Sequence, residues 1–388
     1  MKKKTRYWLF VMIAACLCIG IYFNNNYYFA GSEELEPDEI RLTACGTGMP
    51  AANPSQASTC WLIETRDAGN FLFDLGSNSM SNVSVLAIAP DELYRVFITH
   101  LHTDHWGGLE SLWAGSWVQG RTRPLEVYGP SGTTPELGTA YAIENFLKAY
   151  NWDRTSRNGR LNTLPGNILA HEFDYKISGQ TVFEKDGAKV ISFPAVHAID
   201  GPVAYVFEYK GLKIALTGDN FPNKFTLENT RDVDVIVHES FLLPEFMVDK
   251  FGLPPESALE VATKVHTSPM AFGQFMNMIK PRHAIAYHFL NLPITRGDIE
   301  DGIREFYKGD LSLASDMMMW NITKDKINER RVLWNPFNPP KPGTPLPAEP
   351  EKAMKMSNFI SGSMIDVTEA ERGMVQKYKE KYGEPAKY

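Results

Sequence analysis

The sequence predicts an α+β fold in which β-sheets pack on one another and helices lie outside them. Short runs of β-branched and aromatic residues, bounded by Gly, Pro, Asn or Asp, recur along the chain and are typical of strands. Segments of helical periodicity lie between these runs, but not in the regular alternation of a doubly wound sheet. Two apolar runs, 233–237 and 284–287, are too short for helices, which indicates strands buried between layers.

The other elements follow from the same patterns in chain order. Strands are expected at 40–44, 59–65, 71–75 and 94–99, and helices at 80–88, 108–117 and 135–150. Strands resume at 182–184, 189–193, 203–209 and 212–216, with Lys210-Gly211 as a hairpin signal between the last two. Helices are then expected at 258–265, 270–279 and 299–307.

Composition limits the class of protein. The chain has 388 residues, of which 44% are hydrophobic and 22% charged, and this excludes a wholly disordered or multi-span membrane protein. Lys plus Arg number 39 against 46 Asp plus Glu, a net charge of −7 that argues against nucleic acid as a partner. The four cysteines form no Cys-x-x-Cys pair, so any metal must use His and carboxylate ligands.

The N-terminus has the layout of a signal peptide or signal anchor. Lys2, Lys3, Lys4 and Arg6 precede an apolar run at 8–23, and this order predicts export, with the domain in the periplasm or another extracytoplasmic space. Phe29 is bulky where a cleavage site needs a small residue, so an uncleaved membrane anchor is as well supported as a removed peptide. A lipoprotein modified at Cys16 and a buried first helix remain alternatives.

Four regions are expected along the chain. Residues 1–30 form the signal segment, 31–39 a polar linker and 40–335 the globular domain. Residues 336–388 begin with a proline-rich stretch that cannot be helical and continue as a charged tail. Cys45 and Cys60 lie close enough in the expected strands for a disulfide to be considered, but the register is not determined by the sequence.

The most informative motif is H-x-H-x-D-H after an apolar strand. His100 and His102 would project to one face of that strand, and Asp104 and His105 follow at the turn toward a helix. Three further residues of the same chemistry lie at or just past the ends of other predicted strands: His197, Asp219 and His288. Imidazole and carboxylate ligands suit zinc, and also manganese or iron, so two divalent ions are expected.

These seven positions resemble the metallo-β-lactamase-fold superfamily in order and type across residues 40–335. The resemblance implies an αββα sandwich, with two mixed β-sheets flanked by helices and the site where the sheets meet. It also implies a first ion bound by His100, His102 and His197, a second bound by Asp104, His105 and His288, and Asp219 as the bridge. Asp219 stands where zinc β-lactamases have Cys, which argues against antibiotic hydrolysis.

His238-Glu239-Ser240 and His266-Thr267-Ser268 look like elements of the tRNase Z and arylsulfatase branch. By that likeness Glu239 and His266 are candidates for proton donation to a leaving group, with a purely structural role as the alternative. The interval between His105 and His197 lacks the Gly/Pro-rich basic arm of tRNase Z proteins. Residues 109–120, Tyr128-Gly129-Pro130-Ser131-Gly132 and His266-Thr267-Ser268-Pro269 resemble exported bacterial metallohydrolases of the guanitoxin-biosynthesis type, a label that names a family and establishes no substrate.

The predicted activity is hydrolysis of a small ester, most plausibly a phosphodiester or sulfate ester. A hydroxide bridging the two ions would be the nucleophile, and Asp104 would orient it or accept its proton. Lactone, thioester or amide hydrolysis is the alternative, and a non-catalytic binding protein or a mononuclear-iron oxygenase is a more distant one. The expected partners are a small-molecule ester and, through the N-terminal segment, a membrane; the oligomeric state stays open, with a homodimer among the possibilities.

Overall fold

The computed structural model describes residues 26–335 and 343–383. The predicted signal segment lies outside the described residues except for its last five, and so do residues 336–342 of the proline-rich stretch. Within the described part of the chain, no helix combines the length and the apolar character needed to cross a bilayer.

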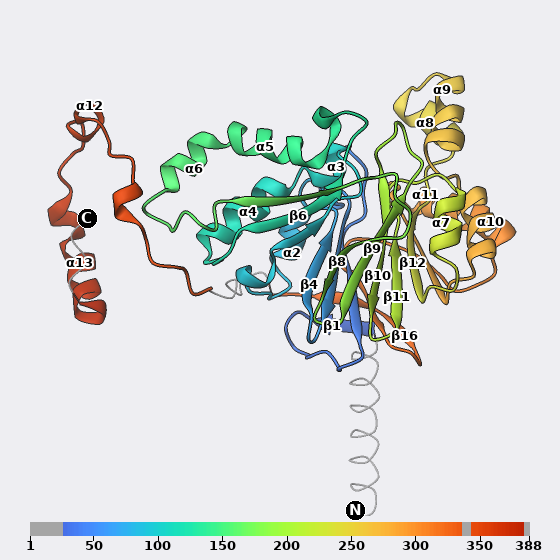
Figure 1. Ribbon diagram of the computed structural model, residues 1–388, viewed down its shortest axis with the longest axis horizontal. Helices are drawn as coiled ribbons and strands as arrows, with labels where there is room; N and C mark the ends of the chain where they lie inside the picture. The colour runs from blue at the N-terminus through green and yellow to red at the C-terminus, as the bar shows by residue number, and fades with distance from the viewer. Residues whose placement is uncertain (1–25, 336–342, 384–388) are drawn as a thin grey trace, which may run out of the picture.

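Two mixed sheets pack face to face between two layers of helices, as Figure 1 shows, and this confirms the predicted αββα sandwich. The first sheet has the order β1-β16-β15-β2-β3-β4-β5-β6-β7 and the second β14-β13-β12-β11-β10-β9-β8. The strands of the first sheet are β1 (Tyr27–Phe29), β2 (Ile40–Gly46), β3 (Cys60–Thr65), β4 (Gly69–Phe73), β5 (Arg95–Phe97), β6 (Leu125–Pro130), β7 (Ile168–Phe173), β15 (Met318–Ile322) and β16 (Ile327–Leu333). Those of the second are β8 (Gln180–Lys185), β9 (Ala188–Pro194), β10 (Val203–Tyr209), β11 (Leu212–Leu216), β12 (Val235–Glu239), β13 (His283–Tyr287) and β14 (Leu311–Leu313).

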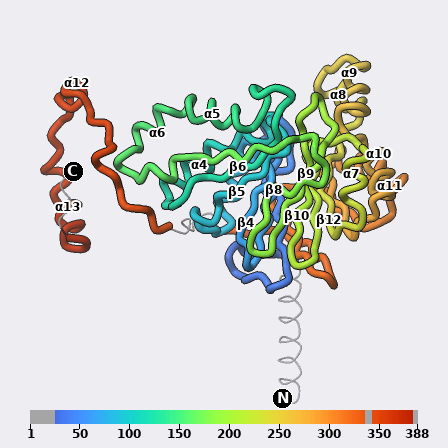
Figure 2. The backbone as a smooth tube through the Cα atoms, viewed as in Figure 1, coloured from blue at the N-terminus to red at the C-terminus, as the bar shows by residue number. Residues whose placement is uncertain are grey.

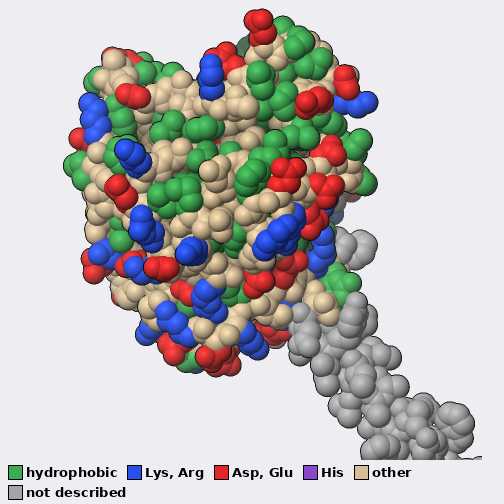
Figure 3. Space-filling model, turned by 90° about the vertical axis from the view of Figure 1, so that its right-hand side faces the viewer, with side chains coloured by type: hydrophobic (Ala, Val, Ile, Leu, Met, Phe, Trp, Pro, Cys, Tyr) green, Lys and Arg blue, Asp and Glu red, His purple; other side chains and the backbone are tan. Residues whose placement is uncertain are grey.

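The helices divide between the outer faces. The side of the first sheet carries α2 (Ser79–Val83), α3 (Thr103–Trp106), α4 (Leu109–Val118), α5 (Thr139–Ala149) and α6 (Asn151–Arg157). The side of the second carries α7 (Lys224–Asn229), α8 (Pro244–Phe251), α9 (Pro255–Glu260), α10 (Pro269–Ile279) and α11 (Pro293–Phe306). The face over this second layer carries Lys and Arg interspersed with Asp and Glu, as Figure 3 shows, the pattern of a solvated surface.

Side chains that alternate between the two faces of each strand form the core between the sheets and the core beneath the helices. In β3, Trp61 and Ile63 belong to the core between the sheets, whereas Cys60 and Leu62 pack against the helices of the first layer. This follows from the period of two, which sends neighbouring side chains to opposite faces. Cys45 and Cys60 are both buried with free thiols, so the considered disulfide is not formed.

The folded part begins earlier than residue 40, the predicted domain start. Strand β1 pairs in parallel with β16, and the Tyr28 hydroxyl accepts a hydrogen bond from Arg41 at 3.0 Å. Residues 31–39 differ from the expected free linker, because Glu33 pairs with Arg330 at 2.8 Å and Leu35 is buried. The prediction assigned these residues by polarity alone, and polarity does not reveal a partly buried ion pair with a residue remote in the sequence.

Several other elements differ from the prediction. Besides β1, the strands β6, β7, β14, β15 and β16 were not expected; the Asn of β15 and the charges of β16, for example, have low strand propensity. The helix expected at 135–150 is divided into a short 3-10 turn (Pro135–Leu137), α5 and α6. The helix expected at 80–88 ends at Val83, and that expected at 258–265 changes at Val261 to a π-helical turn (Val261–Val265).

Part of the C-terminal tail packs on the domain. The Gly343 N–H donates to the Gln119 carbonyl at 3.1 Å, and Glu349 accepts hydrogen bonds from the Thr163 N–H and hydroxyl, both at 2.7 Å. Beyond residue 353 the tail extends away from the body as α12 (Asn358–Ser361) and α13 (Thr368–Tyr382), with mostly exposed side chains (Figure 2).

Candidate metal centre

The seven predicted ligands come from loops and from the short helix α3 at one edge of the sandwich. His197, Asp219 and His288 follow the carboxyl ends of β9, β11 and β13, which run in the same direction within the second sheet. The prediction that His100 and His102 lie on a strand is wrong, because β5 ends at Phe97. They lie in the loop that leads into α3. The path of this loop, and not strand geometry, brings the two rings to the same cluster.

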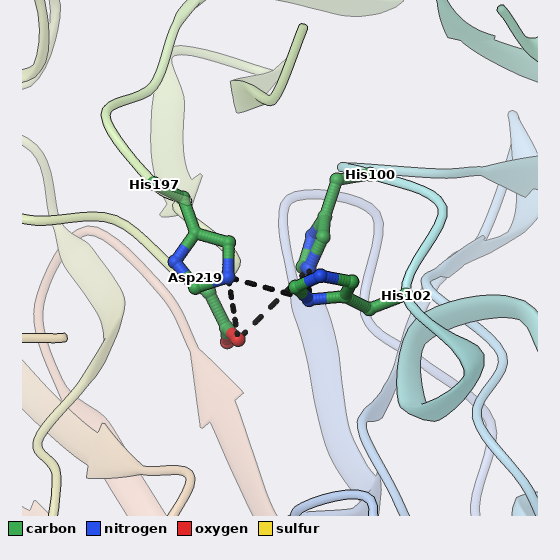
Figure 4. A group of neighbouring side chains, drawn as sticks. All are labelled: His100, His102, His197 and Asp219. Carbon is green, nitrogen blue, oxygen red and sulfur yellow. Dashed lines mark hydrogen bonds and ion pairs between the residues drawn. The ribbon is translucent and has the colours of Figure 1, made fainter. Parts of the chain in front are cut away.

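Three imidazoles and one carboxylate form the first group (Figure 4). His102 Nδ1 lies 3.0 Å from His100 Nε2 and 3.3 Å from His197 Nε2. Asp219 Oδ2 lies 3.9 Å from His100 Nε2 and 3.7 Å from His197 Nε2. His102 is the exposed member of this group, so the group is open to solvent on its side.

A second group shares Asp219 with the first. It consists of Asp104, His105, Asp219 and His288, all buried. Asp219 Oδ1 lies 3.2 Å from His105 Nε2 and 3.3 Å from His288 Nε2, and His288 Nε2 lies 3.1 Å from Asp104 Oδ2. The two oxygens of Asp219 thus face different groups, which is the arrangement of a bridging carboxylate.

Neighbouring groups fix which ring nitrogen faces each cluster. His197 Nδ1 lies 3.0 Å from the Val265 carbonyl, and His105 Nδ1 lies 2.8 Å from Asp74 Oδ2. Each Nδ1–H can donate to its oxygen, which leaves Nε2 with its lone pair toward the cluster. Asp74 also accepts hydrogen bonds from the Thr99 N–H and hydroxyl.

Sequence reasoning missed Asp74. It is buried directly after β4, in the left-handed region at φ 56°. The available signal was an aspartate directly after the apolar run Phe71-Leu72-Phe73, which is the position that His288 also occupies relative to its strand.

The electrostatics suit cation ligands. Burial and the neighbouring His105 lower the pKa of His100 well below its usual range, and burial and His197 lower that of His102. Both rings are therefore neutral at pH 7, with free lone pairs. Burial opposes ionisation of Asp219, but His288 and His105 outweigh it and hold the pKa of this carboxyl well below its ordinary value.

The residues fit a pair of divalent ions. Asp104 Oδ1, Asp219 Oδ1 and His105 Nε2 are buried without a hydrogen-bond partner among the described residues. Buried polar atoms are rarely left so, and two cations with the water that they bind would satisfy all three. Imidazole nitrogens that face each other at 3.0 Å and 3.3 Å cannot all be hydrogen-bonded, but they can share one ion.

A third group adjoins Asp219 and contains the two weaker candidates. His266 Nδ1 lies 2.6 Å from Glu239 Oε2, and the His266 ring stacks on Phe241 with centroids 4.0 Å apart. Burial disfavours a charged imidazole, but Glu239 outweighs it and raises the pKa of His266 to about 9. His266 is thus protonated at neutral pH, and its side chain keeps 12% exposure beside the clusters.

Comparisons with known proteins agree with this fold. The model of the metallo-beta-lactamase superfamily matches residues 55–244. A Ribonuclease Z of Mycobacterium marinum is 30% identical over 207 residues, which are 51% of this chain and 70% of the relative, and one of Methanococcus maripaludis is 29% identical over 258 residues, 62% and 72%. A metallo-beta-lactamase fold protein from Bacillus subtilis superposes with a TM-score of 0.55 at 15% identity, covering 74% of this chain and all of the other.

The fold and the paired clusters therefore define a metallohydrolase, a class whose members typically bind two divalent metals. The chain belongs to the metallo-beta-lactamase superfamily. It is a metal-dependent hydrolase that acts on ester bonds.

Proposed function

We propose that this protein hydrolyses a small ester outside the cytoplasm, with a phosphodiester or a sulfate ester as the bond cleaved. One observation carries the proposal: His266, hydrogen-bonded to Glu239, adjoins two clusters that share Asp219. A histidine in this position supports protonation of a departing alcohol oxygen beside a site that can hold two cations.

The two clusters divide the ligands. One cation would be held by His100, His102 and His197. The other would be held by Asp104, His105 and His288, and Asp219 would contact both cations. When bound, such a pair activates water and stabilises the negative charge that develops on the ester oxygens. Zinc is the proposed metal, with manganese or iron as alternatives, because imidazole and carboxylate suit all three.

The protein's own side chains supply proton transfer and orientation. Asp104 keeps Oδ1 free while Oδ2 faces His288, so Oδ1 is available to orient the attacking water and to accept its proton. His266 can give its proton to the departing oxygen from the nitrogen that Glu239 does not occupy. Glu239 is a positioning residue, since it fixes the ring through Nδ1 and accepts a further hydrogen bond from the Asn220 N–H.

The charge of this protein favours a small substrate over RNA. The relatives are named Ribonuclease Z, but the net charge of −7 disfavours a polyanion. Export and membrane attachment rest on the basic residues and apolar run of the N-terminal segment. Fractionation of cells that express the full-length protein tests this location; recovery in the cytoplasm alone would refute it.

The activity is tested on the full-length, metal-loaded protein. Metals per chain are counted, and bis-aryl phosphate, aryl sulfate, lactone and thioester substrates are assayed with and without chelator. We expect two ions and chelator-sensitive cleavage of the phosphate or sulfate ester, lost in Asp104→Ala and retained in Asp249→Ala, an exposed aspartate of α8. Cleavage of lactone or thioester alone would favour the alternative hydrolase, and two ions without turnover would favour a binding protein.

A further inference from the structure

A cavity of about 300 Å³ opens directly beside the first cluster. Its floor is formed by His100, His102 and His197. Its walls come from two loops, the one that follows β6 and the one that joins β9 to β10. A group bound to the clusters through its ester would therefore extend into this space.

The walls are largely apolar. Six of the residues that line the cavity are hydrophobic: Leu101, Pro130, Leu137, Ala198, Ile199 and Pro202. Ile199 is 63% exposed and Leu137 49% exposed, so apolar surface stands in water at the mouth. Exposed apolar surface that borders a cavity is typical of a binding site for an organic group.

The acidic and basic side chains that line the cavity are all acidic, apart from the histidines of the first cluster. Glu136 lies on one loop and Asp200 on the other, and among the described lining residues there is neither lysine nor arginine. A hydrogen bond from Thr134 lowers the pKa of Glu136, so this carboxyl is ionised at neutral pH. Sites for polyanions need the opposite sign. The clusters can attract an anionic ester, whereas the cavity beyond them repels a second negative charge.

Hydrogen bonds hold both loops in place before any ligand binds. In the loop after β6, the Ser131 N–H donates to the Phe173 carbonyl at 2.8 Å. The Ala195 N–H donates to the Pro202 carbonyl at 3.0 Å and closes the loop that carries Asp200. Gly201 adopts φ +134°, which other residues rarely do, and an added Cβ would lie 3.7 Å from the Ser131 carbonyl of the facing loop. The cavity is thus largely pre-formed, which reduces the cost of ordering on binding.

We infer that this cavity receives the organic group of the ester and selects an apolar group that carries an ammonium-type positive charge, through Glu136 and Asp200. The inference rests on the proposed function, because it names the substrate class of the same site. Methyl and methylene groups would contact the six apolar residues, and the cation would lie near the two carboxylates at the mouth.

Choline phosphate and 3,3-dimethylbutyl phosphate test the inference, because they have the same shape and differ in the positive charge. Their binding to the full-length, metal-loaded protein is measured by calorimetry. We expect choline phosphate to bind about 5- to 10-fold more tightly, and we expect Glu136→Gln/Asp200→Asn to remove this preference while the neutral ligand keeps its affinity within about twofold. The matched control is Asp298→Asn/Glu305→Gln, two exposed carboxylates of α11 that do not line the cavity.

Turnover separates the inference from the proposed function. The p-nitrophenyl diesters of the same two phosphates are assayed with the same variants. If neither diester is cleaved, the proposed phosphodiesterase activity fails, and the binding preference still decides the inference. Equal affinity for the two ligands, or a preference that persists in the cavity variant, would overturn the inference even if both diesters are cleaved.

Discussion

Glu239 Oε2 lies 2.6 Å from His266 Nδ1, and the pair adjoins the carboxylate that both clusters share. The contact connects the end of β12 with the turn between the π-helical segment and α10. It fixes one ring nitrogen of His266 and leaves the other for a ligand.

His266→Ala should slow the hydrolysis of esters with poor leaving groups by about 100-fold or more, because the departing oxygen then lacks a proton donor. The same variant should lose less than about fivefold on p-nitrophenyl esters, whose leaving group departs as the anion. Steady-state kcat on alkyl and p-nitrophenyl esters measures the difference. An equal loss on both would indicate that His266 only supports the structure.

The pair also predicts how the stability of the metal-free protein depends on pH. The pKa of His266 is about 9 in the folded protein and near 6.5 when unfolded, so the folded state binds the proton more tightly. Wild type should exceed His266→Gln in stability by about 3 kcal/mol below pH 6.5, and this difference should disappear as pH rises through 9. Denaturant unfolding of both proteins in the presence of chelator measures it; a difference that grows with pH would contradict the assignment.

Asp219→Ala should abolish the binding of both ions, because its two oxygens face different clusters. His102→Ala should weaken mainly the first ion, since His102 belongs to the first group alone. Elemental analysis after dialysis gives the metals per chain, with Asp249→Ala as the control. Retention of one full equivalent by Asp219→Ala would show that the carboxylate is not shared.

Asp74→Asn should lower the affinity for the second ion by about 10- to 100-fold, because Asp74 orients His105 without belonging to a cluster. Competition with a chromophoric chelator measures this affinity. Asp91→Asn is a control that removes another hydrogen-bonded aspartate, one whose partners Thr122 and Arg123 belong to neither cluster. Unchanged affinity in Asp74→Asn would remove it from the metal centre.

The fold was largely predictable where local pattern and burial agree. Strand β10 was predicted with its observed bounds, because both of its faces are covered and its apolar residues are nearly continuous. Strand β16 could not be predicted, since its charges pair with residues remote in the sequence, such as Glu33. The same holds for β1, whose three residues form a strand only because β16 offers an edge.

The candidate site divides in the same way. His100, His102, Asp104 and His105 were found from local spacing, and His197, Asp219 and His288 from their place after strands and the family resemblance. Asp74 escaped, because its role depends on contact with His105, 31 positions away.

The sequence alone was enough to predict the family, the seven candidate ligands and the candidates Glu239 and His266, because ligand chemistry and strand ends are local properties. The three-dimensional structure was needed to show that the two oxygens of Asp219 face different clusters, that Glu239 raises the pKa of His266, and that Glu136 and Asp200 line one cavity. The physical reason is distance: each of these relationships joins atoms a few ångströms apart in residues that lie far apart along the chain, and packing of the two sheets alone brings them together.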